Sequence, residues 1–542
     1  MDIDNYVFIQ LFFIEIEEEV LVLSKKIIAS FCMFLVALSI GSCGKNEKID
    51  DTTEKNQEPV VLTWYIRGDQ DRLNQMECFL ELERRLSVDI EFIAPAANSD
   101  DAYKLMLASG NLPDIIMWKH NDYPCGGEVG RLYADQIAID LTEYIEKYAP
   151  NLSQIYQERP EIKNEVMTLD NKLIYFPSIN PMQTTEERIR KSNSGLVIRN
   201  DWLEKVSMEM PITIRDWYEV LTAFKEKDPN RNGLPDEIPF EGGGIDSFLP
   251  AYGILGGICL KGDKVVYGPM ELEYKQFLEE MNLWYQEGLI GKSSLVSYDK
   301  WTDENVMGNL TGAFKGLDNA WTKYLPGLLE RVEDASFAAA PWPENENGKK
   351  YTNRVEMGTY IMQDLTIITS QCKNPEAAVK VIDYMYGEEG KLLLNYGIEH
   401  KTYELVEGKP ILTEYAMEKN KEGRLNLYEY AMPYVSFPKY GGFEASLQAY
   451  LPAQVEASRI WADCDTALIY PPAIAMPVED TVLVTAYMSE IDAYMIEMQI
   501  KFISGEEPLS NFDIYKNTLV KKGVEEVIAA YQKNYNIYIN RD

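Results

Sequence analysis

Several patterns that mark metalloenzymes, nucleotide-binding proteins or serine hydrolases are missing from this 542-residue sequence. It has only two histidines, His120 and His400, and their wide separation excludes an HExxH zinc hydrolase, so we expect structural or solvent-facing roles. The cysteines after residue 43 form no CxxC pair and no disulfide framework, which predicts mostly buried thiols. GLIGKSS at residues 288–294 lacks the first glycine of a phosphate-binding loop, and no GxSxG nucleophile elbow occurs.

Basic residues are also scarce. The chain has 52 lysines and arginines against 87 aspartates and glutamates, which gives a formal net charge of -35. So acidic a surface repels phosphate backbones, so we expect no nucleic-acid partner. Hydrophobic residues make up an ordinary 46%, and the roughly 500 residues after position 43 suffice for two or three domains with large cores.

A long membrane-spanning run is missing from the N-terminal region too. Lys25 and Lys26 precede an apolar run at residues 27–40, and its length of about 14 residues falls short of the roughly 20 that span a bilayer. A basic step followed by a short apolar run is typical of a secretory signal. The IGSC sequence at residues 40–43 resembles a bacterial lipobox, in which Cys43 would be diacylated and become the new N-terminus. An ordinary signal peptide with a chance cysteine is the alternative.

The first 22 residues do not fit a signal, because acids such as Asp2, Asp4 and the EIEEE run occupy the place of a basic start. We hypothesise that translation begins at Leu23 through an alternative initiation codon; peptides from residues 2–20 in a proteome digest would contradict this. We therefore expect residues 1–42 to be a signal peptide, of which residues 1–22 would be a misannotated start. Residues 44–58 contain one apolar residue and predict a solvated tether, so that 43–58 form a lipidated cysteine with its flexible linker.

Strand and helix patterns alternate where the folded part begins. Apolar or alternating segments at residues 60–66, 87–94 and 112–118 predict strands, and helical patterns at 71–86 and 101–110 separate them. This order predicts a parallel α/β sheet, in which ligands bind beyond the carboxyl ends of the strands. The candidate ligand contacts at these ends are Trp64, Arg67, Asp69 and Trp118.

The motif that points most directly to chemistry is DPNRNGLPDEIPF at residues 228–240. Oxygen ligands recur at nearly alternate positions, Gly233 permits a sharp turn, and Ca²⁺ requires six to eight oxygens. The candidate ligands are Asp228, Asn230, Asn232, the carbonyl of Leu234, Asp236 and Glu237. An EF-hand would need a glutamate where Pro239 stands, so this is a different loop with a structural site. The alternative is a turn whose Asx side chains bond only their own backbone.

With the lipobox, the tether, the α/β start and this loop in view, the chain resembles the family 1 extracellular solute-binding lipoproteins of carbohydrate ABC transporters. The resemblance covers nearly everything after Cys43, and its most specific stretch runs from residue 202 to 240. Further matching segments are GNLPDIIMW, LVIRNDWLEK, GAFKG, AVKVIDYMYGEEGKLLLNYGIE and KFISGEEPLSNFDIYKNTLVKKG.

The resemblance implies an α/β fold of two lobes, of the type 2 periplasmic-binding-protein kind, with a hinge between them. It places residues 59–180 and 357–400 in an N-terminal lobe, and residues 181–356 and 401–542 in a C-terminal lobe. The calcium ligands of some alginate-binding relatives match the loop residues named above. Ligand contacts vary within the family, and Trp321 joins the four strand-end residues as a candidate.

The family is not catalytic, so the resemblance implies a binding protein rather than an enzyme. We expect a monomer that captures an oligosaccharide and hands it to ABC permease subunits. Its place would be the extracellular face of the cytoplasmic membrane of a Gram-positive-type bacterium. Two alternatives stay open: a secreted carbohydrate-active hydrolase, and a surface adhesin lipoprotein without a transport role.

Overall fold

The computed structural model describes residues 59–540, apart from 96–99, 120–125, 169, 183, 190, 292–294, 296–297, 422, 433–436, 442–443, 473 and 475. The predicted signal, Cys43 and the tether lie outside the described residues, as do His120 and Cys125. Residues from Pro59 onward form one compact unit. Within it, two sheets and two large hydrophobic cores define an N-lobe and a C-lobe.

The sheet of the N-lobe has six strands. Their order is β14 (Lys439–Tyr440), β4 (Phe176–Ile179), β11 (Ile361–Ile368), β3 (Ile115–Lys119), β1 (Val60–Tyr65) and β2 (Val88–Ile93). All pairs are parallel except those of β11, which runs against both neighbours. The carboxyl ends of five strands therefore lie at one edge, where β11 begins. We call this the N-lobe edge.

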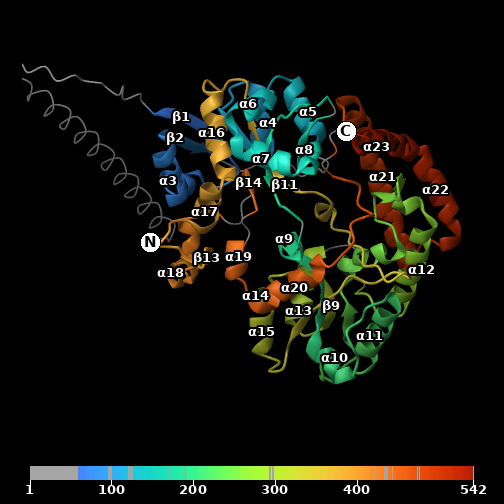
Figure 1. Cartoon of the computed structure of the whole chain (residues 1–542). Helices are drawn as coiled ribbons and strands as arrows, with labels where there is room; N and C mark the ends of the chain where they lie inside the picture. The colour runs from blue at the N-terminus through green and yellow to red at the C-terminus, as the bar shows by residue number, and fades with distance from the viewer. Residues whose placement is uncertain are drawn as a thin grey trace, which may run out of the picture. The chain divides into compact units, whose positions relative to one another are not determined.

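Helices cover this sheet, and Figure 1 shows α4, α6, α7 and α16 gathered around it. The N-lobe helices are α2 (Gln70–Leu73), α3 (Glu77–Leu86), α4 (Asp100–Ser109), α5 (Gly126–Ala134), α6 (Thr142–Tyr148), α7 (Pro150–Glu158), α8 (Pro160–Val166), α16 (Pro375–Tyr386), α17 (Glu388–Tyr396), α18 (Glu414–Met417) and α19 (Glu444–Gln448). A hairpin of β12 (Tyr403–Val406) and β13 (Lys409–Leu412) packs beside α17 and α19.

The sheet of the C-lobe has four strands, in the order β10 (Phe337–Ala340), β5 (Ser194–Arg199), β9 (Thr311–Leu317) and β6 (Ile238–Phe240). Only β5 is antiparallel to its neighbours. The other three strands end at a common edge, where β5 begins, and we call it the C-lobe edge. A separate hairpin, β7 (Ile258–Lys261) with β8 (Lys264–Tyr267), packs against the last helix.

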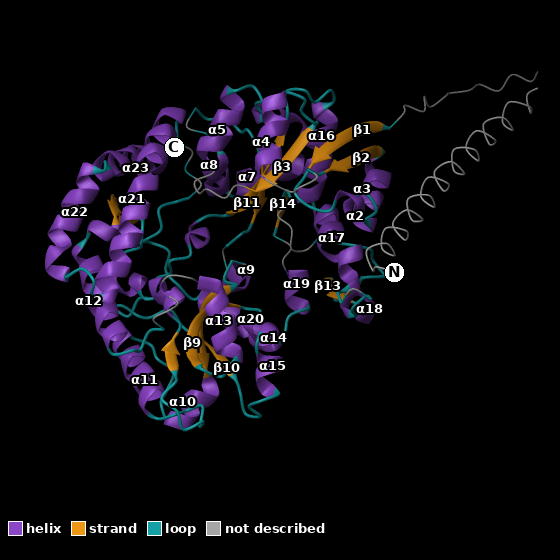
Figure 2. Cartoon of the chain, turned by 180° about the vertical axis from the view of Figure 1, so that it is seen from behind, coloured by secondary structure: helices purple, strands orange, loops and turns teal. Residues whose placement is uncertain are grey.

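The C-lobe is rich in helices, and Figure 2 shows α10, α13 and α20 around its sheet. They are α9 (Thr185–Ile189), α10 (Asn200–Val206), α11 (Ile214–Glu226), α12 (Leu272–Gln286), α13 (Tyr298–Met307), α14 (Ala320–Lys323), α15 (Leu325–Leu329), α20 (Pro452–Ala462), α21 (Val478–Ser504), α22 (Phe512–Lys521) and α23 (Val524–Ile539). α11 begins at a capping box, in which Thr213 and Asp216 satisfy each other's backbone N–H groups. In the described ranges, every helix is too short or too polar to cross a bilayer.

Three chain segments connect the two edges, and we call them the crossings. Residues 180–193 lead from the end of β4 to the start of β5, and residues 341–360 lead from the end of β10 to the start of β11. Residues 441–451 lead from the end of β14 to α20. Each crossing starts at the carboxyl edge of one lobe. The first two end at the carboxyl edge of the other lobe, and the third ends at α20, as expected for a two-lobed binding protein.

The third crossing differs from the expected lobe boundary. The sequence assigned residues 401–542 to the C-terminal lobe, but β14 pairs with β4 in the N-lobe sheet, and Phe437 packs in the N-lobe core. The N-lobe thus extends beyond residue 440, to α19, rather than to residue 400. The segment LVIRNDWLEK passes from strand to helix within its length: β5 ends at Arg199 and α10 begins at Asn200.

Candidate functional site

The two carboxyl edges and the crossings between them are where a ligand is expected, because open α/β sheets bind ligands beyond the carboxyl ends of their strands. At the C-lobe edge, β6 continues into a 3₁₀ helix, η1 (Gly242–Ser247), and β9 ends just before Asp318. The second crossing passes the same region, because Asn353 Nδ2 donates to the Asp246 carbonyl over 3.2 Å.

Several polar groups on this edge have no partner among the residues that the structure describes. We define the edge set as Ser247, Lys315, Asp318 and Asn353. Ser247 Oγ, Asp318 Oδ2 and Asn353 Oδ1 are buried and have no hydrogen-bond partner among the described residues. Among the described residues, the Lys315 ammonium likewise has no hydrogen-bond acceptor and no ion-pair partner. A buried polar group without a partner costs about 1–3 kcal/mol, so the edge set is prepared for a polar ligand.

The neighbours of the edge set fix its position. A Cβ at Gly244 would stand 2.6 Å from Lys315 Cβ, so glycine there allows η1 to pack directly on β9. Gln499 Nε2, from α21, donates to Asp246 Oδ1 over 2.9 Å. Arg354 holds the second crossing in place by donating to the Ser194 carbonyl and to the Lys191 carbonyl. Rigid elements therefore position the unpaired groups.

The electrostatics of the edge set follow from its burial. Burial raises the pKa of Asp318 to about 6, although the Asn319 N–H and the nearby Arg354 charge oppose the shift. Burial lowers the pKa of Lys315, while the Asp246 carboxylate acts against it. The edge set thus offers a strong donor, a strong acceptor, a hydroxyl and an amide oxygen. Sugar hydroxyls both donate and accept, and such groups would satisfy this mixture.

The predicted contacts on the N-lobe edge lie in different environments. Trp64 has no exposed surface; its ring packs 5.7 Å from Phe92 and 5.5 Å from Phe437, centroid to centroid. It is a core residue in this structure. Arg67 and Asp69 follow β1 and are exposed, and Asp69 Oδ1 caps α2 by accepting from Arg72 N over 3.1 Å.

Trp118 belongs to β3, where its backbone pairs with Leu365. Its side chain lies outside the described residues, so its suggested contact with a ligand stays a prediction.

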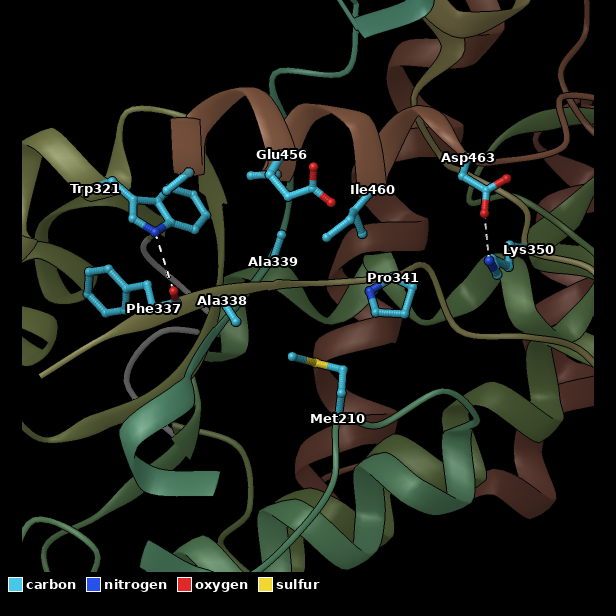
Figure 3. A pocket seen from close by; sticks show the side chains of 12 residues that line it. Met210, Trp321, Phe337, Ala338, Ala339, Pro341, Lys350, Glu456, Ile460 and Asp463 are labelled. Atoms are coloured by element: carbon cyan, nitrogen blue, oxygen red, sulfur yellow. Dashed lines mark hydrogen bonds and ion pairs between the residues drawn. The ribbon is translucent and has the colours of Figure 1, made fainter. Parts of the chain in front are cut away.

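A groove runs beside the edge strand β10, and we call it the β10 groove. Its cavity volume is about 550 Å³. Figure 3 shows Met210 on one side, Glu456 and Ile460 of α20 on the other, and an ion pair between Lys350 and Asp463 near one end. Trp321 is 6% exposed and lines this groove, donating from Nε1 to the Phe337 carbonyl over 3.3 Å. The structure thus separates Trp321 from Arg67 and Asp69, which lie on the other lobe.

The predicted metal loop is tightly curled. Asp228 and Arg231 have φ values of 44° and 58°, and Gly233 has a φ of 75°. Asn232 N and Gly233 N donate to the two oxygens of Asp228 over 3.1 Å each. Leu234 N donates to Asn232 Oδ1 over 2.7 Å, as in the Asx turns that form the alternative explanation.

Glu237 lies near both Asp228 and Asp236 in this loop, a proximity that Asx turns do not require. The side-chain amides of Asn230 and Asn232 donate to Asp236 Oδ1 over 3.0 Å each. Glu237 Oε1 is buried without a partner among the described residues, and burial together with Asp228 and Asp236 raises the pKa of Glu237. The described residues nevertheless contain no group of three acidic, His or Cys side chains already arranged around a metal ion. The residue types fit Ca²⁺, provided the two amides turn their oxygens inward.

Comparison with known proteins identifies the family. The sequence pattern of the family described as bacterial extracellular solute-binding protein matches residues 83–392. This chain belongs to that family. Solute-binding proteins bind and release their ligands without transforming them, so the prediction that the chain is not an enzyme is confirmed.

Two relatives match this solute-binding protein over most of its length. The fructooligosaccharide ABC transporter substrate-binding protein FusA of Streptococcus pneumoniae is 26% identical over 484 residues, covering 86% of this chain and 87% of FusA. Lipoprotein LipO of Bacillus subtilis is 23% identical over 521 residues, covering 92% of this chain and 97% of LipO.

Solved structures confirm the predicted two-lobed α/β fold. FusA in complex with kestose superposes with a TM-score of 0.66 at 25% identity, covering 88% of this chain and 99% of FusA. The alginate-binding protein AlgQ2, in a structure without calcium ion, gives a TM-score of 0.66 at 20% identity, covering 90% of this chain and all of AlgQ2. The edge set was not predicted from the sequence, although Lys315 lies in the GAFKG segment that matched the family.

Proposed function

We propose that this solute-binding protein captures an oligosaccharide between its two carboxyl edges and delivers it to the permease subunits of an ABC transporter. The observation that carries this proposal is the edge set, whose polar groups lack partners in the described part of the chain, at the place where a ligand of this fold is expected. FusA, a relative over most of the chain, is a fructooligosaccharide-binding protein, which supports a sugar as the ligand.

Capture would proceed by closure of the lobes around the sugar. Hydroxyls of the sugar satisfy Asp318, Lys315 and Asn353, and the exposed Arg67 and Asp69 add contacts from the N-lobe. Because these contacts form together only when the lobes are closed, the ligand binds the closed state more tightly and shifts the population toward it. The permeases then recognise the loaded, closed protein.

Calorimetry against a glycan panel tests this function. The panel contains kestose, nystose and short galacturonan oligomers, and chromatography of each mixture monitors product formation. Saturable binding without products is the expected result, and binding should weaken in Asp318→Asn. Release of shorter sugars would indicate a hydrolase. No binding to any glycan would favour an adhesin and overturn the proposal.

We also propose that the loop at residues 228–237 holds a structural Ca²⁺. Asp228, Asp236 and Glu237 would supply carboxylates, Asn230 and Asn232 amide oxygens, and Leu234 its carbonyl. Bound calcium would neutralise the repulsion between the three carboxylates and so stabilise the connection from α11 to β6. Among the relatives, a FusA variant is described as an EF-hand mutant, which supports a metal-binding loop in this family.

The lipid anchor is a further part of the proposal. Cys43 would carry the lipid, and residues 44–58 would let the protein move above the outer face of the cytoplasmic membrane. LipO, a relative over nearly its whole length, is described as a lipoprotein. Cys43→Ser should remove acylation and release the protein into the medium. Continued labelling of this variant with a radioactive fatty acid would contradict the anchor.

A further inference from the structure

One arginine lies where the chain leaves the N-lobe for the crossings. Arg159 precedes α8 and is 8% exposed. Its Nη2 donates to the Pro181 carbonyl in the first crossing over 3.2 Å, and its Nη1 donates over 3.2 Å to the hydroxyl of Tyr440, where the third crossing begins. Its guanidinium lies 5.2 Å from the ring centroid of Tyr360 in the second crossing. One side chain thus contacts two of the crossings and the last residue of β14, after which the third crossing starts.

The helix that follows Arg159, α8, is anchored in the N-lobe. Pro160 starts α8 at its first position, and Ile162 and Val166 are buried in the N-lobe core. The remaining guanidinium nitrogen, Nε, donates to Glu161 Oε1 over 2.5 Å, so the donors toward the crossings keep a defined orientation. A planar guanidinium can make these contacts at once, whereas an ammonium cannot match their directions.

Two other buried charges hold the second crossing at the same place. Glu165, also on α8, accepts from Tyr360 N over 2.9 Å. Lys191, at the end of the first crossing, donates to the carbonyls of Thr359 and Ile361. We call Arg159, Glu165 and Lys191 the hinge clamp. The Tyr360 carbonyl also accepts from Asn180 N over 2.7 Å, so the backbone of the second crossing is held from both sides.

We infer that Arg159 is the positioning residue of the hinge, and that it sets the range over which the lobes open and close. Every change of lobe angle must alter the backbone of the three crossings, and Arg159 resists these changes where the crossings leave the N-lobe. The inference rests on the proposed capture by lobe closure, but it concerns the lobes in the absence of any sugar.

The consequence is measurable as a distribution of distances between the lobes. A contact shifts the ratio of open to closed molecules only by the difference in its free energy between the two states. A hydrogen bond from a charged donor is worth roughly 10-fold in an equilibrium constant, so Arg159 contacts that form in one state alone should shift this ratio by up to about that factor when they are lost. Spin labels at Glu143→Cys in the N-lobe and Arg215→Cys in the C-lobe report the distance by pulsed electron resonance. Both positions are exposed, and Cys372→Ser removes the least buried native thiol among the described residues.

Four variants of the ligand-free protein complete the test. Arg159→Gln should broaden and shift the distance distribution, Arg159→Lys should do so less because it keeps a cation near Tyr360, and Tyr440→Phe should have the smallest effect. Glu161→Gln is the matched control, because the glutamine amide oxygen still accepts from Nε and only the charge is removed, at a position that touches no crossing. Tyr440→Phe keeps the test valid if Arg159→Gln does not fold.

An unchanged distribution in folded Arg159→Lys and Tyr440→Phe would overturn the inference. So would an equal shift in Glu161→Gln, because the effect would then come from the anchoring of α8. Since the measurement contains no glycan, a negative glycan panel leaves its outcome intact, and the two failures are distinguishable.

Discussion

Lys191 is a buried lysine and Lys315 a half-buried one, and they differ in what surrounds them. Lys191, in the hinge clamp, donates to two backbone carbonyls and lies near the buried carboxylate of Glu165. Lys315, in the edge set, has no hydrogen-bond or ion-pair partner among the described residues, and burial lowers its pKa. The first lysine is satisfied within the protein, whereas the second is left for another molecule to satisfy.

This difference separates the polar groups that hold the fold from those that await a ligand. A paired buried charge is costly to disrupt, because its partner is then left alone in a medium of low dielectric constant. An unpaired buried charge already lowers the free energy of unfolding, so removing it should raise that free energy. Substituting equivalent residues in the two regions should therefore give effects of opposite sign.

The largest expected difference is between Lys191→Met and Lys315→Met. The first leaves the Thr359 and Ile361 carbonyls without their donor, and we expect it to lower the free energy of unfolding by roughly 3–5 kcal/mol. The second removes an unpaired ammonium and should leave stability unchanged or raise it by about 1 kcal/mol. Urea denaturation followed by tryptophan fluorescence measures both. Equal losses in the two variants would show that the comparison is wrong.

The pH dependence of stability tests the hinge clamp. Burial raises the pKa of Glu165 to about 7, although Thr359, Tyr360 N–H and Lys191 act in the opposite direction. A carboxyl whose pKa is higher in the folded state stabilises the protein most below its unfolded value, and this contribution is lost as the pH rises to about 7. The change amounts to about 3 kcal/mol.

Glu165→Gln keeps an acceptor for Tyr360 N–H but does not titrate. Between pH 5 and pH 7.5 it should therefore lose less stability than the native protein, as measured by urea denaturation across this range. A parallel pH profile for the two proteins would rule out Glu165 as the source.

Asp318→Asn tests the edge set, in which we expect polar groups to await a ligand rather than to hold the fold. We expect affinity for the glycan found in the panel to fall roughly 10-fold or more, because a charged acceptor is lost. The melting temperature should rise, because a buried carboxylate without a full set of partners is removed. Native affinity should also fall as the pH drops through about 6, where Asp318 takes up a proton. A variant with lower affinity and lower stability would indicate a structural role instead.

The metal loop is expected to behave like the edge set, because Glu237 Oε1 is buried without a partner among the described residues and lies near two other carboxylates. Calcium at tenfold excess over its dissociation constant should stabilise the protein by about 1.4 kcal/mol. Removal by EDTA should lower the melting temperature, and added Ca²⁺ should restore it. Asp228→Asn is the control, since it removes one proposed ligand. An unchanged melt in excess chelator would contradict the site.

Much of the fold could be predicted from local patterns. The strands β1, β2 and β3 lie within or close to the predicted segments, because apolar and β-branched runs flanked by helical patterns reflect burial directly. Strand parity also indicates which side chains of a strand face the core. Leu62 and Trp64 share one face of β1 and are both buried, which places Trp64 in the core.

The parts of the fold and of the site that could not be predicted depend on contacts between residues distant in sequence. β14 has only two residues, and nothing local shows that Lys439 and Tyr440 pair with β4. The edge set combines residues from η1, β9 and the second crossing, so its lack of partners is visible only once these segments are together. The metal loop is contiguous, and its candidate ligands could therefore be proposed from spacing alone.

The late position of β14 has a consequence for how the protein is made. The N-lobe sheet begins with β1 at Val60 and is complete only when Lys439 and Tyr440 have been synthesised, after most of the C-lobe. Neither lobe corresponds to one continuous stretch of chain, so a ribosome cannot release them as finished domains in turn. We expect the chain to remain without its completed first sheet throughout most of its synthesis, a condition that suits passage through a secretion channel as an unfolded thread.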